Sequence, residues 1–169
     1  MKSLHFINSV TGTGVSNISM TNCFTEQFDS YMVQVSKLLC STQANIDIRF
    51  IDNSDSVISD SDYCYATHQI LSSGFSERKD NSGTSISRLI AFGSDNTNEG
   101  GSGYSYIINP YDSSSFTFTS GSSATVEGGN YNGDFQIGIH KVKERITGIN
   151  LLTSGGTMDI TVNMFGIKR

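Results

Sequence analysis

Histidines, cysteines and clustered carboxylates are the residues from which a catalytic or metal site could be built, and this chain has few of them. The three histidines, His5, His68 and His140, lie far apart and have no neighbouring ligand at a metal-binding spacing. Each is therefore predicted to be a surface or strand histidine. The sequence predicts no catalytic residue, no cofactor-binding residue and no metal ligand.

No serine or sugar-cleaving site is indicated. In GGSGY (100–104), Tyr104 occupies the position at which a GxSxG nucleophile elbow needs its last glycine. Paired carboxylates of a glycosidase could meet only in the fold. The chain has no tryptophan to form a sugar platform, and its tyrosines are interpreted first as partly buried sheet residues. The tyrosines that could substitute as a platform are Tyr63, Tyr65, Tyr104, Tyr106, Tyr111 and Tyr131. We therefore predict that the protein is not an enzyme.

The acidic segment DNSDSVISDSD (52–62) offers four carboxylates, and calcium prefers oxygen ligands. The segment lacks the ordered D-x-D-x-D-G spacing and the distal glutamate of a calcium loop. A solvated hairpin loop is the favoured interpretation, with calcium binding as the alternative, and no cofactor is expected. The four carboxylates belong to Asp52, Asp55, Asp60 and Asp62.

The three cysteines, Cys23, Cys40 and Cys64, are an odd number at wide spacings, and no CxxC motif occurs. This pattern indicates neither a disulfide framework nor a zinc site. Cys64 stands between two tyrosines in a strand-like run and is predicted to pack as a small apolar residue. The simplest interpretation is synthesis in a reducing cytoplasm.

The composition favours an all-β chain. Its 169 residues are rich in Ser, Thr, Asn and Gly, 16% are charged, 36% are hydrophobic and one is proline. Short strands joined by small polar loops have this profile, whereas long helices favour Ala, Leu, Glu and Lys. The length fits one domain, residues 1–169.

Charge and hydropathy argue against two classes of partner. The net charge is −5, and the basic run HKVKER (140–145) is predicted to be a solvated strand end, so nucleic acid is not an expected partner. No window approaches the ~18 continuous apolar residues of a membrane span. The N-terminus, MKSLHFINSV, is too short and polar for a signal peptide, so the mature protein is expected to start near Met1.

Period-two alternation predicts about ten strands in an antiparallel two-sheet β-sandwich. YMVQVSKLL (31–39) and ANIDIRFID (44–52) each alternate apolar with polar residues, and the short CSTQ between them predicts a hairpin. The predicted core comprises Tyr31, Val33, Val35, Ile46, Ile48, Phe50, Ile160, Val162 and Met164. Further predicted strands are 17–20, 63–71, 85–92, 104–109, 115–119, 134–142, 145–153 and 158–167.

Clusters of Gly, Asn, Asp and Ser predict the connections. ERKDNSG (77–83), GSDNTNEGGSG (93–103) and EGGNYNGD (127–134) are interpreted as turns. A second hairpin is predicted around SGG (154–156), in which Gly155 and Gly156 can adopt positive φ. The last strand is therefore expected to be structural core.

Four segments carry a resemblance to a known family. They are FTEQFDSYMVQVSKLL, ANIDIRFIDNSDSVISDSDYCY, YSYIINPYDSSSFTFTSGSSA and ITGINLLTSGGTMDITVNMFGIKR. Their order resembles a group of small virion proteins of tailed bacteriophages, especially marine ones. The matching residues are Phe28, Tyr31, Ile48, Phe50, Asn109, Pro110, Gly166, Ile167 and Lys168. The chain departs from the pattern at Phe165, where the family has Tyr, and over 72–103, which match nothing.

The resemblance implies a jelly-roll-like domain on the outside of a virion, made in the host bacterial cytoplasm. It implies a capsid decoration protein, with a tail-associated or receptor- and glycan-binding module as the alternative, and it implies no catalytic residues. The expected partners are major capsid or tail proteins and further copies of the chain, with a trimer as the family's habit. A host-surface glycan is the remaining candidate partner.

Overall fold

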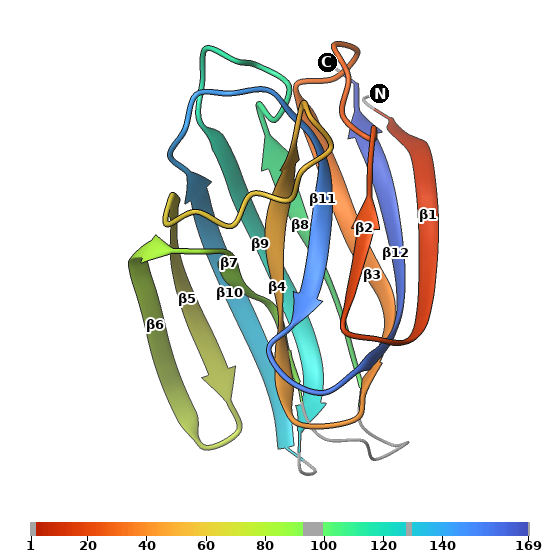
Figure 1. Cartoon of the computed structure of the whole chain (residues 1–169). Coiled ribbons are helices and arrows are strands. Elements are labelled where there is room, and N and C mark those ends of the chain that lie inside the picture. The colour runs from red at the N-terminus through yellow and green to blue at the C-terminus, as the bar shows by residue number, and fades with distance from the viewer. Residues whose placement is uncertain (1–2, 93–99, 128–129, 169) are drawn as a thin grey trace.

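The computed structural model describes residues 3–92, 100–127 and 130–168, which form twelve strands in two antiparallel sheets (Figure 1). These residues contain no helix, and so none that is long and apolar enough to cross a membrane. The strands are β1 (Leu4–Val15), β2 (Asn17–Met20), β3 (Ser30–Cys40), β4 (Ala44–Asp52), β5 (Tyr63–Leu71), β6 (Gly74–Gly83), β7 (Ile86–Phe92), β8 (Gly101–Ile108), β9 (Thr117–Glu127), β10 (Asn130–His140), β11 (Ile146–Thr153) and β12 (Met158–Ile167).

The strand order is that of a jelly roll with two additions. The large sheet runs β1-β12-β3-β8-β9-β10-β5-β6 and the small sheet runs β2-β11-β4-β7. Without β5, β6, β9 and β10, eight strands remain in two sheets of four. The first strand then lies beside the last, as in the double Greek key of a jelly roll. The predicted all-β, jelly-roll-like sandwich is confirmed.

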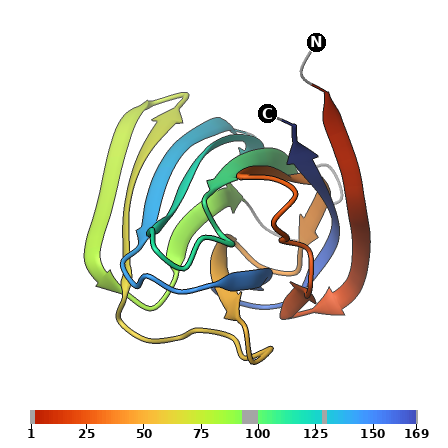
Figure 2. The ribbon, with the colours of Figure 1, turned by 90° about the horizontal axis from the view of Figure 1, so that it is seen from above.

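Two inserted hairpins extend the large sheet on one side. β5 and β6 lie between β4 and β7 in the sequence, and β9 and β10 lie between β8 and β11. In space the four strands are neighbours, in the order β9-β10-β5-β6, and we call them the extension. Figure 2 shows the large sheet as a curved wall around the small sheet, with β5 and β6 at one end and β1 at the other.

The nine residues predicted to form the core are all buried and belong to one hydrophobic cluster. Val33 and Val35 of β3 pair with Met164 and Val162 of β12, so these strands present adjoining apolar rows to the small sheet. This part of the prediction is confirmed because both strands follow the simple rule of apolar inside and polar outside.

Two strands were not predicted, and both lie at edges of the large sheet. β1 pairs with β12, and β6 pairs with β5 across positions such as Thr67 and Arg78. The prediction that 77–83 is a turn is therefore wrong. Edge strands tolerate charged and polar residues on both faces, which hides the alternation in the sequence. Residues 130–134 and 101–103, assigned to turns, belong to β10 and β8, and residues 93–99 lie outside the described residues.

Both predicted hairpins are wrong, because each connection crosses from one sheet to the other. β3 and β12 belong to the large sheet, and β4 and β11 to the small one. The two crossings lie side by side, since the Ser41 amide donates to the Thr157 carbonyl at 2.9 Å and the Thr157 amide donates to Ser41 Oγ at 2.8 Å. Of the two turn glycines only Gly156 has positive φ, at 63°. A short polar connector has the same sequence signature in a hairpin and in a crossing.

Candidate functional site: the outer face of the extension

The polarity of β10 is inverted relative to an ordinary sandwich strand. Its inward residues Asn132, Asp134 and Gln136 are buried, whereas Phe135 and Ile137, on the opposite face, are 56% and 60% exposed. A strand normally turns its apolar residues to the core and its polar residues to solvent. The sheet at β10 therefore offers an apolar surface to the outside.

The neighbouring strands share this inversion. On β9, Thr117 and Thr119 are buried while Phe118 is 36% exposed, and on β8 the buried Ser105 lies between Tyr104 and Tyr106, which are 41% and 40% exposed. The centroids of these two tyrosine rings lie 5.7 Å apart with the rings edge to face. The apolar surface therefore continues across at least three strands.

The interior beneath the extension is polar. Gln136 Nε2 donates to Thr119 Oγ1 at 2.7 Å, and Arg88 Nη1 of β7 donates to Gln69 Oε1 at 3.3 Å. Arg88 has φ of 63°, a strained conformation for a residue with a long side chain. Burying polar groups costs free energy unless they are hydrogen-bonded, so this half of the interior drives folding less than the jelly-roll core.

We define the outer face as the exposed apolar surface of the extension together with β8. Six aromatic side chains that are 36–76% exposed contribute roughly 600 Å² of it, if each offers ~200 Å² when free. The largest apolar patch on a typical monomer is ~300–600 Å², and larger patches mark interaction sites. The face comprises Ile70, Phe75, Tyr104, Tyr106, Ile108, Phe118, Tyr131, Phe135 and Ile137.

A groove runs along the outer face above β5. Its larger part, ≈500 Å³, has the small side chain of Ala66 between Phe135 and Ile137 of β10 and Glu77 and Lys79 of β6. A smaller part, ≈180 Å³, shares Ala66 and Ile137 and continues past Cys64 to Ile139. The outer face thus includes a ridge on β10 beside a groove on β5.

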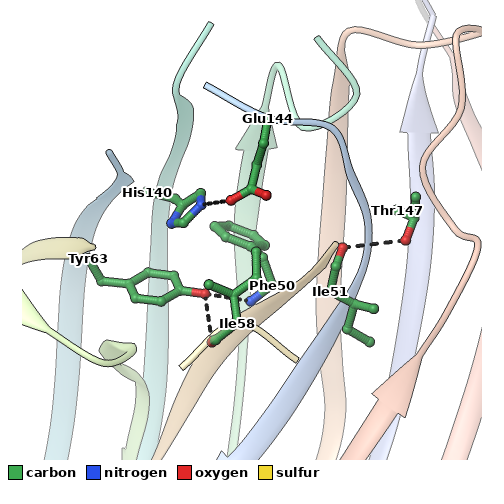
Figure 3. A network of polar contacts seen from close by, with 7 residues as sticks. All are labelled: Phe50, Ile51, Ile58, Tyr63, His140, Glu144 and Thr147. Carbon is green, nitrogen blue, oxygen red and sulfur yellow. Dashed lines mark hydrogen bonds and ion pairs between the residues drawn. The ribbon is translucent and has the colours of Figure 1, made fainter. Parts of the chain in front are cut away.

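The one described histidine with a carboxylate partner lies inside the sandwich (Figure 3). His140 is fully buried, and its Nε2 lies 2.8 Å from Oε1 of Glu144, which follows β10. The ring packs against Tyr63 at 4.9 Å and against Phe50 at 5.9 Å between centroids. The His140 ring is enclosed by these aromatic side chains, whereas the Glu144 side chain is 33% exposed.

Tyr63 fastens the 52–62 loop to the sheet. Its hydroxyl donates to the Ile58 carbonyl at 3.1 Å and accepts from the Phe50 amide at 3.0 Å, as Figure 3 shows. Burial raises the pKa of Tyr63, so the hydroxyl stays protonated and can donate. On the other side of β4, Thr147 Oγ1 donates to the Asp52 carbonyl at 2.7 Å. The cluster holds a loop in place.

The acidic loop is organised by its own backbone. Asp52 Oδ1 accepts from the amides of Ser54 and Ser56 at 2.7 and 3.0 Å, and Ile51 forms a bridge with Val57. Within the described residues no three His, Cys, Asp or Glu side chains gather as a group that could hold a metal ion.

The other residues considered from the sequence are dispersed. His5 and His68 are exposed strand residues, as predicted, but His140 is buried. The basic run 140–145 ends β10 and forms a connection, in which the Arg145 guanidinium lies 4.6 Å from the centroid of the Tyr111 ring. Cys64 is half-buried on the outer side of β5 and donates to the Asn81 carbonyl at 3.3 Å.

The alternation in β10 shows that one face of this strand is apolar, but it does not show which face points outward. In DFQIGIH, apolar and polar residues alternate strictly, but alternation does not tell which set points inward. The glycine at 138 resolves the direction. A Cβ there would lie 2.6 Å from Ile86 Cγ2 and 2.7 Å from Thr119 Oγ1, so Gly138 belongs to the inward set with Gln136.

Comparison with known proteins assigns the chain to no family. No protein-family model and no curated protein matches the chain. A search of solved structures finds a fructofuranosidase from Schwanniomyces occidentalis complexed with fructosylnystose, at 8% identity and a TM-score of 0.21. The alignment covers 99% of this chain and 34% of that one, so this chain spans about a third of its length. A likeness this weak carries no argument about fold or function.

Proposed function

We propose that this chain is a non-enzymatic structural protein of a bacteriophage particle that decorates the capsid surface. The single observation that carries the proposal is the outer face, an exposed surface of large apolar side chains over the part of the sheet whose inward residues are polar. An isolated protein gains nothing from turning Phe135 and Ile137 to solvent, whereas an assembled one covers them.

Three further points support this proposal. The jelly roll and the family resemblance agree with a virion surface protein. His140, the buried member of the His140–Glu144 pair, packs against Tyr63, which holds the 52–62 loop. The outer face carries few charges, so copies and capsid proteins can approach it without strong repulsion although the chain has a net charge of −5.

Quantitative mass spectrometry of particles purified from the host tests the proposal. We expect many copies of the chain per particle, and density for a jelly roll on the outside of the capsid in a reconstruction. Absence of the chain from purified particles would overturn the proposal. Presence in a few copies at the tail would move the chain to the alternative function.

That alternative, a tail-associated module that binds a host glycan, is favoured by one observation. Tyr104 and Tyr106 form an exposed edge-to-face pair on β8, and aromatic rings are suitable platforms for sugars. Binding to a panel of bacterial surface glycans, lost on Tyr104→Ala and Tyr106→Ala, would support it.

A further inference from the structure

We propose that two copies of this chain pair face to face through their extensions. The two-fold axis lies between them, parallel to the strands, above the boundary of β10 and β5. This inference rests on the proposed function, because it names the partner that covers the outer face. Such an axis places β10 of one copy over β5 of the other, and β9 over β6.

The sheet register then fixes the contacts between copies. Rotation about an axis parallel to the strands leaves each residue at its own level along the strand. Residues that are register partners within one sheet therefore become opposing residues across the interface. Ile137 pairs with Ala66 and Gly133 pairs with Ile70, so Ile137 faces Ala66 of the second copy and Ile70 faces Gly133 of the second copy.

In this arrangement, large side chains of one copy contact small side chains of the other. Ile137, 60% exposed, enters the groove whose floor is Ala66 of the second copy. On the same level as Ile70 and Gly133 lie Phe75 of β6 and Ala124 of β9. Phe75, 73% exposed, therefore covers Ala124 of the second copy. Interlocking of this kind gives the shape complementarity of stable interfaces.

Aromatic contacts follow from the next level. Phe135 is the register partner of His68, so each Phe135 faces His68 of the second copy. Within one copy His68 already lies 5.3 Å from Phe75 between ring centroids. The pairing would join Phe135 to this aromatic group, and buried aromatic residues are the usual anchors of protein interfaces.

The charges on this surface are compatible with self-pairing. Glu77 and Lys79 lie at the levels of His68 and Ala66, where β9 carries Ser122 and Ser120. Each charge therefore faces a serine of the second copy, and no like charges oppose one another. Opposed like charges weaken an interface, and this register avoids them.

The area of the extension is also close to that of a standard interface. Four strands ~4.8 Å apart, with ~10 residues rising ~3.4 Å each, give a flat footprint of roughly 650 Å². The relief of the side chains adds to this value. Stable interfaces need ~800 Å² per partner, so the extension alone comes close to the area of a standard interface.

Charge exchange between two variants tests the register directly. Ile137→Glu and Ala66→Lys alter outward side chains and should leave the far-UV circular dichroism spectrum of the folded protein unchanged, so that loss of the dimer is not loss of the fold. Sedimentation velocity should show a dimer for the unaltered protein and a monomer for each variant alone. An equimolar mixture should regain a dimer. In the mixed dimer, Glu introduced at position 137 of one copy faces Lys introduced at position 66 of the other. The symmetry-related contact keeps its original Ile137 and Ala66.

A matched control is Leu4→Glu, which alters a residue that is 53% exposed on β1 at the far edge of the same sheet, and which should leave the dimer intact. The pairing would be overturned if the unaltered protein were a monomer or a trimer, or if both variants alone remained dimeric. The register would be overturned if the mixture of the two variants failed to dimerise. Particle association is measured independently, so a monomer abundant on particles would sink this inference and leave the proposed function standing.

Discussion

Four of the jelly-roll strands share the large sheet with the extension, but the two parts of this sheet use their faces in opposite ways. On β12 the inward residues, such as Val162 and Met164, are apolar and fully buried. On β10 the inward residues are polar, and the apolar ones, Phe135 and Ile137, face outward. The difference indicates that the jelly roll supplies most of the free energy of folding, whereas the extension exposes the apolar surface that we propose is used for assembly.

The largest effect expected from this comparison is at Val162. Val162→Asp places an unpaired carboxylate in the hydrophobic core, which costs several kcal/mol and should unfold the domain or make it insoluble. Far-UV circular dichroism and solubility after expression measure the outcome. A soluble, folded Val162→Asp protein would show that the jelly-roll core is not what holds the fold.

The matched variant in the extension is Ile137→Asp. Ile137 belongs to the same kind of alternating strand but is 60% exposed, so the carboxylate stays in water in the monomer. We expect a folded protein whose change in unfolding free energy is below ~1 kcal/mol. An unfolded Ile137→Asp protein would contradict the claim that the jelly roll, and not the extension, supplies most of the free energy of folding.

A smaller effect is expected where β7 of the small sheet approaches the extension. Gly138→Ala would place a Cβ 2.6 Å from Ile86 Cγ2, so strands must separate or side chains must shift. Overpacking of this kind costs ~1–3 kcal/mol, measured by urea unfolding. Gly133→Ala is the control on the same strand, because its Cβ would meet nothing closer than the Ser123 carbonyl at 3.4 Å. Equal losses at the two positions would contradict the close approach.

Tyr63→Phe should have an effect of similar or slightly smaller size. It removes the acceptor of the buried Phe50 amide and the donor to the Ile58 carbonyl. An unsatisfied buried group costs ~1–3 kcal/mol, and the 52–62 loop should exchange its amide hydrogens faster. Tyr106→Phe, on the exposed outer face, should change the stability little. Unchanged exchange in the loop of Tyr63→Phe would show that Tyr63 does not fasten it.

Much of the fold could be predicted from the sequence, and the site could not. Strands such as β3 and β4 obey the rule of apolar inside, so their buried residues followed from alternation. The edge strand β6 is polar on both faces and gives no such signal. The crossings at 41–43 and 154–157 depend on which sheet each strand joins, which is a long-range property. The outer face depends on the direction of β10, and that is decided by packing against β7.

The last prediction concerns the stability of the protein at alkaline pH. It distinguishes the buried thiols of Cys23 and Cys40 from the half-buried thiol of Cys64. Burial raises the pKa of Cys23 from 9.0 to about 12 and that of Cys40 from 9.0 to about 11. A raised pKa stabilises the fold below the unfolded pKa, and this contribution is lost as the pH rises through the folded pKa. Urea unfolding should therefore show stability falling from pH ~9 upward, and less steeply in Cys23→Ala. An identical slope in that variant would contradict burial as the cause, and Cys64→Ala is the control.

The claim that the outer face pairs with a second copy is tested most directly by alkylation of Cys64 in the unaltered protein. This half-buried thiol lines the groove on β5, whereas Cys23 and Cys40 are buried. The account predicts that the rate of Cys64 alkylation falls as the protein concentration rises, because pairing covers the groove, and that it stays fast at all concentrations in Ile137→Glu. A rate that is independent of concentration in the unaltered protein, and equal to the rate in Ile137→Glu, would contradict the account.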